Sequence, residues 1–234
     1  MTDVERFKRE LPELFDDFPH SPEPRDPRFA ELLDAVPGLT KANNLALLNL
    51  AAACLDPGES YVEAGTFHGT SLIAAVLDNE TKDFVAVDNF AMSGASRERL
   101  DANLNRFGLR GKATVLERDV FDVLRGDALA GKRIGVFYWD LLHKYEPQLD
   151  GLRVLEQHLV EGALVIVDDT DWPQVARAID DYVAAQPRAE RVLSLPGSDK
   201  GSPQWWEGVE VLRWAGCRVR QPRTTRSEAR AHRP

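Results

Sequence analysis

The chain has 234 residues, a net charge of −9 and 43% hydrophobic residues, enough for one α/β domain with a substantial buried core. No apolar run approaches the roughly 20 residues that a membrane-spanning helix needs. The charged N-terminal segment lacks the apolar centre of a signal peptide. Cys54 and Cys217 show no metal-type spacing and are expected to be reduced and structural. Together these features predict a cytoplasmic protein with no membrane partner.

The charge is distributed unevenly along the chain. Residues 218–234 hold six arginines and one glutamate, a net charge of +5, which leaves −14 on the rest. An acidic body is a poor electrostatic match for a phosphate backbone, and the tail has no aromatic side chain to stack on bases. We therefore expect a basic, disordered tail and no nucleic-acid partner.

The first predicted elements are short helices in a proline-rich segment. Six prolines in residues 1–40 restrict the helices to about 3–11 and 27–35. A strongly apolar helix then runs from Thr40 or Lys41 to about Leu55, where Asp-Pro-Gly ends it. We expect residues 1–40 to form a helical addition and substrate lid, and residues 41–217 to form the main domain.

From residue 61 short apolar strands alternate with amphipathic helices, which predicts parallel β-α-β units. The expected strands are 61–64, 84–88, 113–116, 134–139, 163–167, 191–195 and 209–214. The expected helices are 70–77, 97–107, 120–128, 146–160 and 173–185. Thr170 or Asp171 is the expected N-cap of the last helix. No helical pattern separates the last two strands, so the prediction is a seven-stranded, mostly parallel, Rossmann-like sheet with an antiparallel last strand.

The first predicted strand leads into the loop V-E-A-G-T-F-H-G-T-S. Gly65 and Gly69 let the backbone approach a ligand, and the helix that begins near Thr70 points its free N–H groups there. The dinucleotide fingerprint is absent, because Phe67 stands where its second glycine would be. The loop therefore favours a ligand without a pyrophosphate, such as S-adenosylmethionine, whose ammonium group could pair with Glu63. Taken alone, it is equally a tight strand-to-helix turn.

Two later acidic residues strengthen the prediction of a ligand site. Asp88 ends the second strand about 20 residues past the loop, where a carboxylate can bind ribose hydroxyls. Asp119 follows the third strand and could meet the adenine amino group. Each acid alone is more often a helix cap or a solvated residue. Because the ends of successive parallel strands share one crevice, these acids and Glu63 together predict a nucleoside-type site.

Four motifs carry a resemblance to a known family: V-E-A-G-T-F-H-G-T-S, V-A-V-D, D-L-L-H-K-Y-E and V-I-V-D-D-T. In combination they resemble class I S-adenosylmethionine-dependent methyltransferases, especially the macrolide-sugar O-methyltransferases of the methyltransferase-24-like group. The resemblance runs from about Leu39 to Trp214 and implies the class I, Rossmann-like methyltransferase fold. The expected cofactor-binding residues are Glu63, Gly65, Thr66, Phe67, Gly69, Thr70, Ser71, Asp88, Asp119 and Asp140.

A second polar cluster is expected where the fourth and fifth strands end. Asp140 is followed by His143 in the first case, and Asp168 is followed by Asp169 in the second. Adjacent carboxylates repel one another, and their oxygens are ligands that suit Mg²⁺. The resemblance implies that Asp140, Asp168 and Asp169 hold Mg²⁺ and that His143 is the general base for methylation of a small-molecule hydroxyl, on a sugar or a natural-product intermediate.

Several alternatives stay open. Leu141 and Leu142 replace the small polar residues that are usual in that family between the aspartate and the histidine, and His143 could instead cap the helix near Tyr145. The acid pair could also be metal-free. Other readings are a metal-independent methyltransferase, a non-catalytic nucleoside-binding protein, and an NAD-dependent oxidoreductase, which the missing pyrophosphate turn disfavours.

The substrate and the oligomeric state are left open by the sequence. Trp205 and Trp206 form either an apolar wall for a ring substrate or a seal of the final hairpin. The residues do not identify the methyl acceptor, and homo-oligomerisation is an open possibility.

Overall fold

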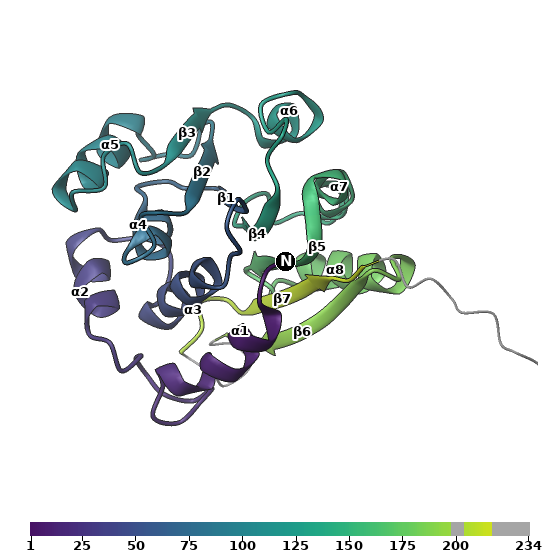
Figure 1. Cartoon of the computed structure of the whole chain (residues 1–234), viewed down its shortest axis with the longest axis horizontal. Coiled ribbons are helices and arrows are strands. Elements are labelled where there is room, and N and C mark those ends of the chain that lie inside the picture. The colour runs from purple at the N-terminus through teal and green to yellow at the C-terminus, as the bar shows by residue number, and fades with distance from the viewer. Residues whose placement is uncertain (198–203, 217–234) are drawn as a thin grey trace, which may run out of the picture.

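The computed structural model describes residues 1–197 and 204–216. Its centre is a seven-stranded sheet of order β3-β2-β1-β4-β5-β7-β6 (Figure 1). The strands are β1 (Ser60–Ala64), β2 (Asp83–Asp88), β3 (Thr114–Glu117), β4 (Ile134–Trp139), β5 (Leu159–Asp168), β6 (Ala189–Leu195) and β7 (Val209–Trp214). The first five strands pair in parallel, while β7 is antiparallel to both β5 and β6. The predicted sheet, including its antiparallel last strand, is confirmed.

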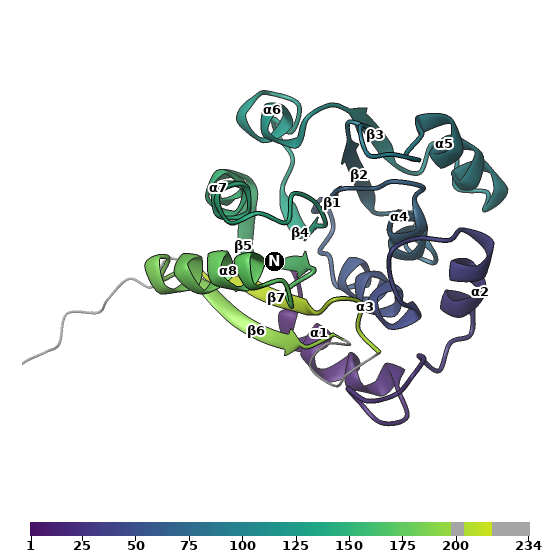
Figure 2. The same ribbon diagram turned by 180° about the vertical axis from the view of Figure 1, so that it is seen from behind.

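Helices cover both faces of the sheet (Figures 1 and 2). One face carries α1 (Val4–Glu10), α2 (Arg28–Ala35), α3 (Ala42–Ala53), α4 (Thr70–Val76) and α5 (Arg97–Arg106). The other carries α6 (Val120–Arg125), α7 (Tyr145–Leu155) and α8 (Pro173–Ala185). Short 3₁₀ turns at Pro12–Leu14 and Glu156–His158 complete the elements.

Strand β1 shows why two hydrophobic cores form. Tyr61 faces the core under α3 and α4, whereas Val62 and Ala64 face the core under α7 and α8. Alternate side chains of a strand point to opposite faces, so a fully buried strand must be apolar on both. Ser60 and Glu63 are the exceptions in this strand, and the Glu63 carboxyl is fully buried.

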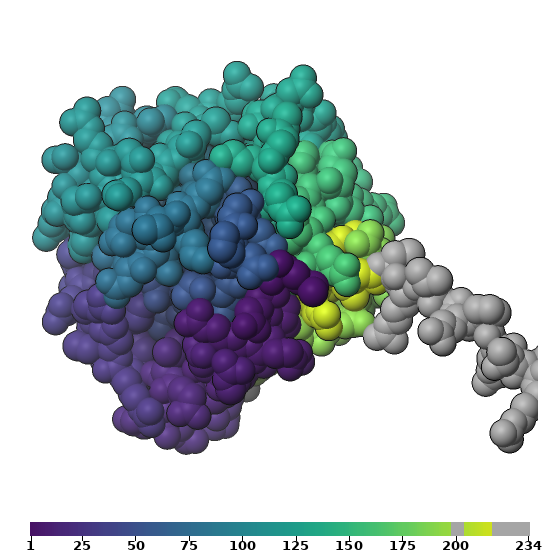
Figure 3. Space-filling view, in the orientation of Figure 1, coloured from purple at the N-terminus to yellow at the C-terminus, as the bar shows by residue number. Residues whose placement is uncertain are grey.

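The N-terminal segment packs into the first core. Helix α3 carries apolar side chains all round its axis, interrupted by three asparagines, as a buried helix can, and Val4, Phe7 and Phe15 from the preceding segment belong to the same cluster. Figure 3 shows this segment, in purple, as part of one continuous surface with the domain. Its predicted role as a substrate lid, and the three predicted segments, stay predictions.

The start of α8 corrects one expectation. Trp172 is its N-cap and makes no side-chain capping bond, so neither Thr170 nor Asp171 caps the helix. Asp171 instead accepts a hydrogen bond from the backbone N–H of Gly197 at 2.8 Å, which ties the end of β5 to the loop after β6.

Some expectations concern parts of the chain without described structure. Cys217 and the basic tail at 218–234 lie outside the described residues, and Cys54 is a buried free thiol. Within the described ranges, no helix combines the length and apolarity needed to span a bilayer.

Candidate active site

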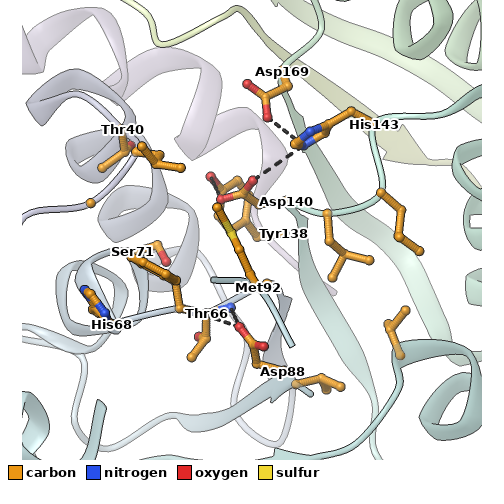
Figure 4. Close-up of a pocket in the computed structure, with 18 of the residues that line it drawn as sticks. Thr40, Thr66, His68, Ser71, Asp88, Met92, Tyr138, Asp140, His143 and Asp169 are labelled. Carbon is orange, nitrogen blue, oxygen red and sulfur yellow. Dashed lines mark hydrogen bonds and ion pairs between the residues drawn. The ribbon is translucent and has the colours of Figure 1, made fainter. Parts of the chain in front are cut away.

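A cavity of about 730 Å³ opens where the parallel strands end. It lies where the sheet order reverses direction, because β1 is flanked by β2 on one side and by β4 on the other. Ligands of open α/β sheets bind at such a switch point. Loops after β1, β2, β3, β4 and β5 all contribute to its wall, and Figure 4 shows the polar side chains that meet in it.

The predicted residues divide into two groups. Ten of them line this pocket: Gly65, Thr66, Phe67, Thr70, Ser71, Asp88, Asp119, Asp140, His143 and Asp169. Glu63, Gly69 and Asp168 do not. Ten of the thirteen predicted residues therefore share one pocket, the other three lie outside its lining, and the predicted binding and catalytic roles stay predictions.

The glycines of the β1 loop are explained by packing within the protein. Gly65 has φ of +93°, and a Cβ atom there would lie 1.9 Å from the carbonyl oxygen of Asp140. The same contact region includes a hydrogen bond from Asp140 N to Ala64 O at 3.0 Å. Gly69 has φ of +89° and would clash with the Leu100 side chain. Both positions need glycine before any ligand is considered.

Asp88 holds the loop in shape. One carboxylate oxygen accepts hydrogen bonds from the backbone N–H groups of Thr66 at 2.9 Å and Phe67 at 2.8 Å. The other oxygen accepts one from Phe90 N at 2.6 Å. Phe67 adopts a positive φ of 48°, a conformation that is uncommon for a bulky residue and needs such support. Asp88 is thus both a pocket residue and a brace for two loops.

Glu63 lies directly beneath the same loop. Its carboxyl accepts hydrogen bonds from the hydroxyls of Tyr61 at 3.1 Å and Ser71 at 3.2 Å, and also from the Thr66 hydroxyl. The side chain is fully buried, and burial raises the pKa of Glu63 to about 8 despite these donors. Its role as partner of a cofactor ammonium stays a prediction.

The raised pKa of Glu63 predicts a pH-dependent stability. The folded protein keeps this carboxyl neutral up to about pH 8, whereas in the unfolded chain it ionises above about pH 4.3. The free energy of unfolding should therefore fall as pH rises between these values, by up to about 1.4 kcal/mol per unit. Glu63→Gln removes the titrating group, so urea unfolding at several pH values should show a flatter profile than wild type. Parallel profiles would contradict the assignment.

Asp119 is the N-cap of helix α6, the alternative role that its sequence position also allowed. It is exposed, begins α6, and accepts hydrogen bonds from Phe121 N at 2.8 Å and Asp122 N at 3.4 Å. It still lines the pocket. Capping by one carboxylate oxygen leaves the other for a ligand, so its predicted adenine contact stays a prediction.

His143 and two acids form a compact cluster at the ends of β4 and β5. His143 Nε2 lies 2.6 Å from Asp169 Oδ2 and 4.0 Å from Asp140 Oδ1 (Figure 4). Asp169 has φ of +56°. The helix after His143 begins with Lys144 as N-cap and has no side-chain capping bond, so His143 does not serve as that cap.

The groups of this cluster shift one another's pKa values. The Asp169 carboxylate raises the pKa of His143. Burial, and then the nearby charge of Asp169, raise the pKa of Asp140 to about 7. Two acids this close resist simultaneous ionisation, and a cation or a proton relieves the conflict.

Asp168 is separated from this cluster. It is 2% exposed, accepts a hydrogen bond from the Tyr138 hydroxyl, and accepts a weak one at 3.4 Å from the Asn44 amide. Tyr138 also reaches Asp140 Oδ2 at 3.4 Å. The group of possible metal-binding side chains that the described residues bring together is Asp140, His143 and Asp169, with His143 where Asp168 was expected.

Several residues in the pocket wall, and Asn44 behind it, were not predicted from the sequence. Asn44 donates to Asp168, and its oxygen accepts from Trp206 N at 3.2 Å, so it links α3, β5 and the final hairpin. The signal was present as an asparagine pair inside a mostly apolar helix. The unpredicted wall residues include Leu39, Thr40, Met92, Arg118 and Trp172.

The two adjacent tryptophans have different environments. Trp205 is fully buried, packs against Phe15 and Phe18, and donates to Pro19 O at 3.0 Å. It therefore joins the hairpin to the N-terminal segment. Trp206 lines the pocket. The contact of Trp206 with a ring substrate stays a prediction.

Comparison with known proteins gives a family match for the central segment of the chain. A family described as a methyltransferase domain matches residues 62–170. An uncharacterized protein of Acanthamoeba polyphaga mimivirus is 28% identical over 148 residues, which cover 59% of this chain and 65% of that protein. The chain thus aligns with somewhat under two thirds of this curated relative.

Solved structures share the fold over nearly the whole chain. A Bacillus cereus O-methyltransferase in complex with S-adenosylhomocysteine superposes with a TM-score of 0.62 and 15% identity, covering 88% of this chain and 96% of that one. TomG of Streptomyces achromogenes, an O-methyltransferase of tomaymycin synthesis in complex with S-adenosylmethionine, gives 0.60 and 18%, covering 92% and 100%. A TDP-rhamnose 3′-O-methyltransferase of calicheamicin biosynthesis gives 0.56 and 22%, covering 91% and 94%.

At these identities the structural likeness establishes the fold, and the family match covers residues 62–170. The resemblance inferred from the sequence motifs is confirmed at that level. Residues 62–170 match a family described as a methyltransferase domain, and the chain has the class I, Rossmann-like methyltransferase fold.

Proposed function

We propose that this protein is an S-adenosylmethionine-dependent O-methyltransferase that acts on a hydroxyl of a small molecule. The observation that carries the proposal is a single pocket with the Asp88-braced loop at one end and the His143–Asp169–Asp140 cluster at the other. The methyltransferase-domain match and the cofactor-bound neighbours support this choice. A sugar or natural-product hydroxyl is the acceptor type suggested by the resemblance.

The loop end of the pocket suits the cofactor. Asp88 and Asp119 present carboxylate oxygens to it, and the wall between them includes Val87 and Val120. Acids at the ends of β2 and β3 can bind ribose and adenine groups, while the valines contact an adenine face. When bound, the cofactor supplies a methyl group that is already activated on a sulfonium.

The other end of the pocket suits proton removal. His143 takes the proton of the acceptor hydroxyl, and the adjacent Asp169 carboxylate stabilises the imidazolium that forms. The acceptor oxygen bonds to the methyl carbon as the carbon–sulfur bond breaks, which leaves a neutral thioether. Fixing the oxygen in line with the methyl group is the main task, since alignment can remove up to about 7–11 kcal/mol of barrier.

Two of the three predicted carboxylates are placed where they could bind a divalent cation together. Asp140 and Asp169 supply two oxygen ligands, and Mg²⁺ commonly takes one or two carboxylates and keeps several waters. The raised pKa values of Asp140 and Asp168, caused first by burial, reflect a conflict that a cation would relieve. A bound Mg²⁺ would lower the pKa of the acceptor hydroxyl. Asp168 could join as a ligand by exchanging its bond to Tyr138.

The cofactor part of this proposal is tested by calorimetry. The full chain should bind S-adenosylmethionine and S-adenosylhomocysteine, and NAD should not compete. Transfer of a labelled methyl group to a panel of hydroxyl compounds then tests the reaction. Binding of NAD alone would overturn the proposal, and tight cofactor binding without any transfer would favour a non-catalytic nucleoside-binding protein.

The metal part has its own expected result. After exhaustive chelation, turnover should fall at least about tenfold and return on titration with Mg²⁺, because hydroxyl activation would then depend on His143 alone. Cofactor affinity should change little and serves as the control. Full turnover in the chelated protein would show that the reaction is metal-independent.

A further inference from the structure

Apolar side chains that are unusually exposed gather at this pocket. In the described residues the exposed large hydrophobic side chains are Met1, Leu39, Met92, Leu142 and Trp172, with exposed fractions of 42–57%. All except Met1 line the cavity. Exposed apolar groups that cluster in this way mark a binding surface. In the view of Figure 4, Met92 lies between Asp88 and Asp140.

Three of the apolar wall residues are tied to the reacting end. Leu142 directly precedes His143 in the chain, and the Trp172 ring lies 5.3 Å from the His143 ring, centroid to centroid. Trp206 joins the same wall and is held at its backbone N–H by Asn44. These groups come from different loops, so the structure gathers them only at the place where the acceptor would lie.

The charges of the described part of the wall disfavour a strongly anionic acceptor. Its formally charged carboxylates are those of Asp88, Asp119, Asp140, Asp169 and Glu207. Arg118 is the one arginine or lysine among the described lining residues. It follows β3, which is separated from β4 by two strands, and so belongs to the cofactor end. Phosphate and carboxylate groups are recognised by arginine and lysine, which the described wall near His143 does not offer.

One buried hydroxyl is left for a polar contact. Thr40 is 8% exposed and lines the pocket, and its Oγ1 has no hydrogen-bond partner among the described residues. In the view of Figure 4 it lies on the other side of Asp140 from His143. A buried hydroxyl without a partner is costly unless a ligand or water completes it.

We infer that the methyl acceptor is an uncharged, largely apolar or aromatic molecule, bound with its hydroxyl toward His143 and its apolar body against Leu39, Leu142, Trp172 and Trp206. Thr40 holds a second polar group of that molecule. The inference rests on the proposed function, because it assigns the acceptor half of the same pocket. It excludes nucleotide-linked sugars and carboxylate-bearing acceptors.

Binding of matched probes tests this inference without requiring turnover. The full chain is freed of divalent metal by chelation and loaded with S-adenosylhomocysteine, and calorimetry then compares naphthol, a hydroxynaphthalene sulfonate and a nucleoside-diphosphate sugar. Naphthol should bind at least about tenfold more tightly than either anionic probe, because a buried anion without a cationic partner is disfavoured. Equal or tighter binding of an anionic probe, or no binding of naphthol, would overturn the inference.

Variants then locate the site. Trp172→Ala should weaken naphthol binding about tenfold, and Trp172→Phe should restore most of it, because the ring supplies apolar contact area. Tyr145→Ala is the matched control, since it removes a partly buried ring that does not line the pocket. Unchanged affinity in Trp172→Ala would contradict the placement.

S-adenosylhomocysteine affinity separates the possible failures. Each variant must retain it, which shows that the fold is intact, and the probe comparison in the wild-type chain does not depend on any variant. If wild type fails to bind S-adenosylhomocysteine, the proposed function itself is wrong. If it binds that ligand but prefers the anionic probes, only the acceptor class is wrong.

Discussion

Replacing His143 by alanine is expected to lower turnover by about 10²- to 10⁴-fold, the usual contribution of a positioned general base. The affinity for S-adenosylmethionine should change little, because His143 lies at the far end of the pocket from the Asp88 loop and contacts Asp169. Single-turnover methyl transfer and calorimetry measure the two quantities separately.

Asp88→Ala tests the cofactor end of the same pocket. Removing this carboxylate leaves the N–H groups of Thr66, Phe67 and Phe90 without their acceptor. Cofactor affinity should fall by about 10- to 100-fold, as expected when two loops lose their brace. An equal loss of cofactor binding in His143→Ala and Asp88→Ala would contradict the division of the pocket into two ends.

Gly65→Ala is expected to destabilise the fold by about 3–5 kcal/mol, at the upper end of single substitutions. The new Cβ would lie 1.9 Å from the Asp140 carbonyl oxygen, and this neighbour is backbone that cannot rotate away. The ends of β1 and β4 would be forced apart, so cofactor binding should be lost as well. Urea unfolding gives the free energy, and calorimetry gives the affinity.

Gly58→Ala supplies the control for Gly65→Ala. Gly58 also has a positive φ, of +80°, but a Cβ there would meet nothing within 4 Å. Its replacement should cost only the conformational penalty of about 1–2 kcal/mol. If both variants are destabilised equally, the close approach of Asp140 to Gly65 is not what requires glycine.

The fold could be predicted from the sequence because it follows from local sequence patterns. Short apolar strands alternating with amphipathic helices predicted the sheet, and the missing helix before Val209 predicted the antiparallel strand. Helix caps were less readable, since Trp172 begins α8 without a side-chain bond and Asp171 binds Gly197 instead. Whether Asp171 caps the helix depends on a loop distant in sequence, and local sequence preferences contain no information about that loop.

The site was predicted in outline for a topological reason. Parallel strands end at one edge, so Asp88, Asp119, Asp140 and Asp169 had to lie near one another. Their partners could not be predicted, because a pairing such as Asp168 with Tyr138 and Asn44 depends on how α3 and the strands pack.

By itself, the sequence determined the seven-stranded, mostly parallel sheet and the set of acids and histidine at its edge, since both follow from periodicity and from the order of strands and loops. The tertiary structure alone decided that His143 approaches Asp169 and that Asp168 accepts a hydrogen bond from Tyr138. It also decided that Leu39, Trp172 and Trp206 share one apolar wall. These contacts join residues far apart in the chain, and only packing across the sheet brings such residues within reach.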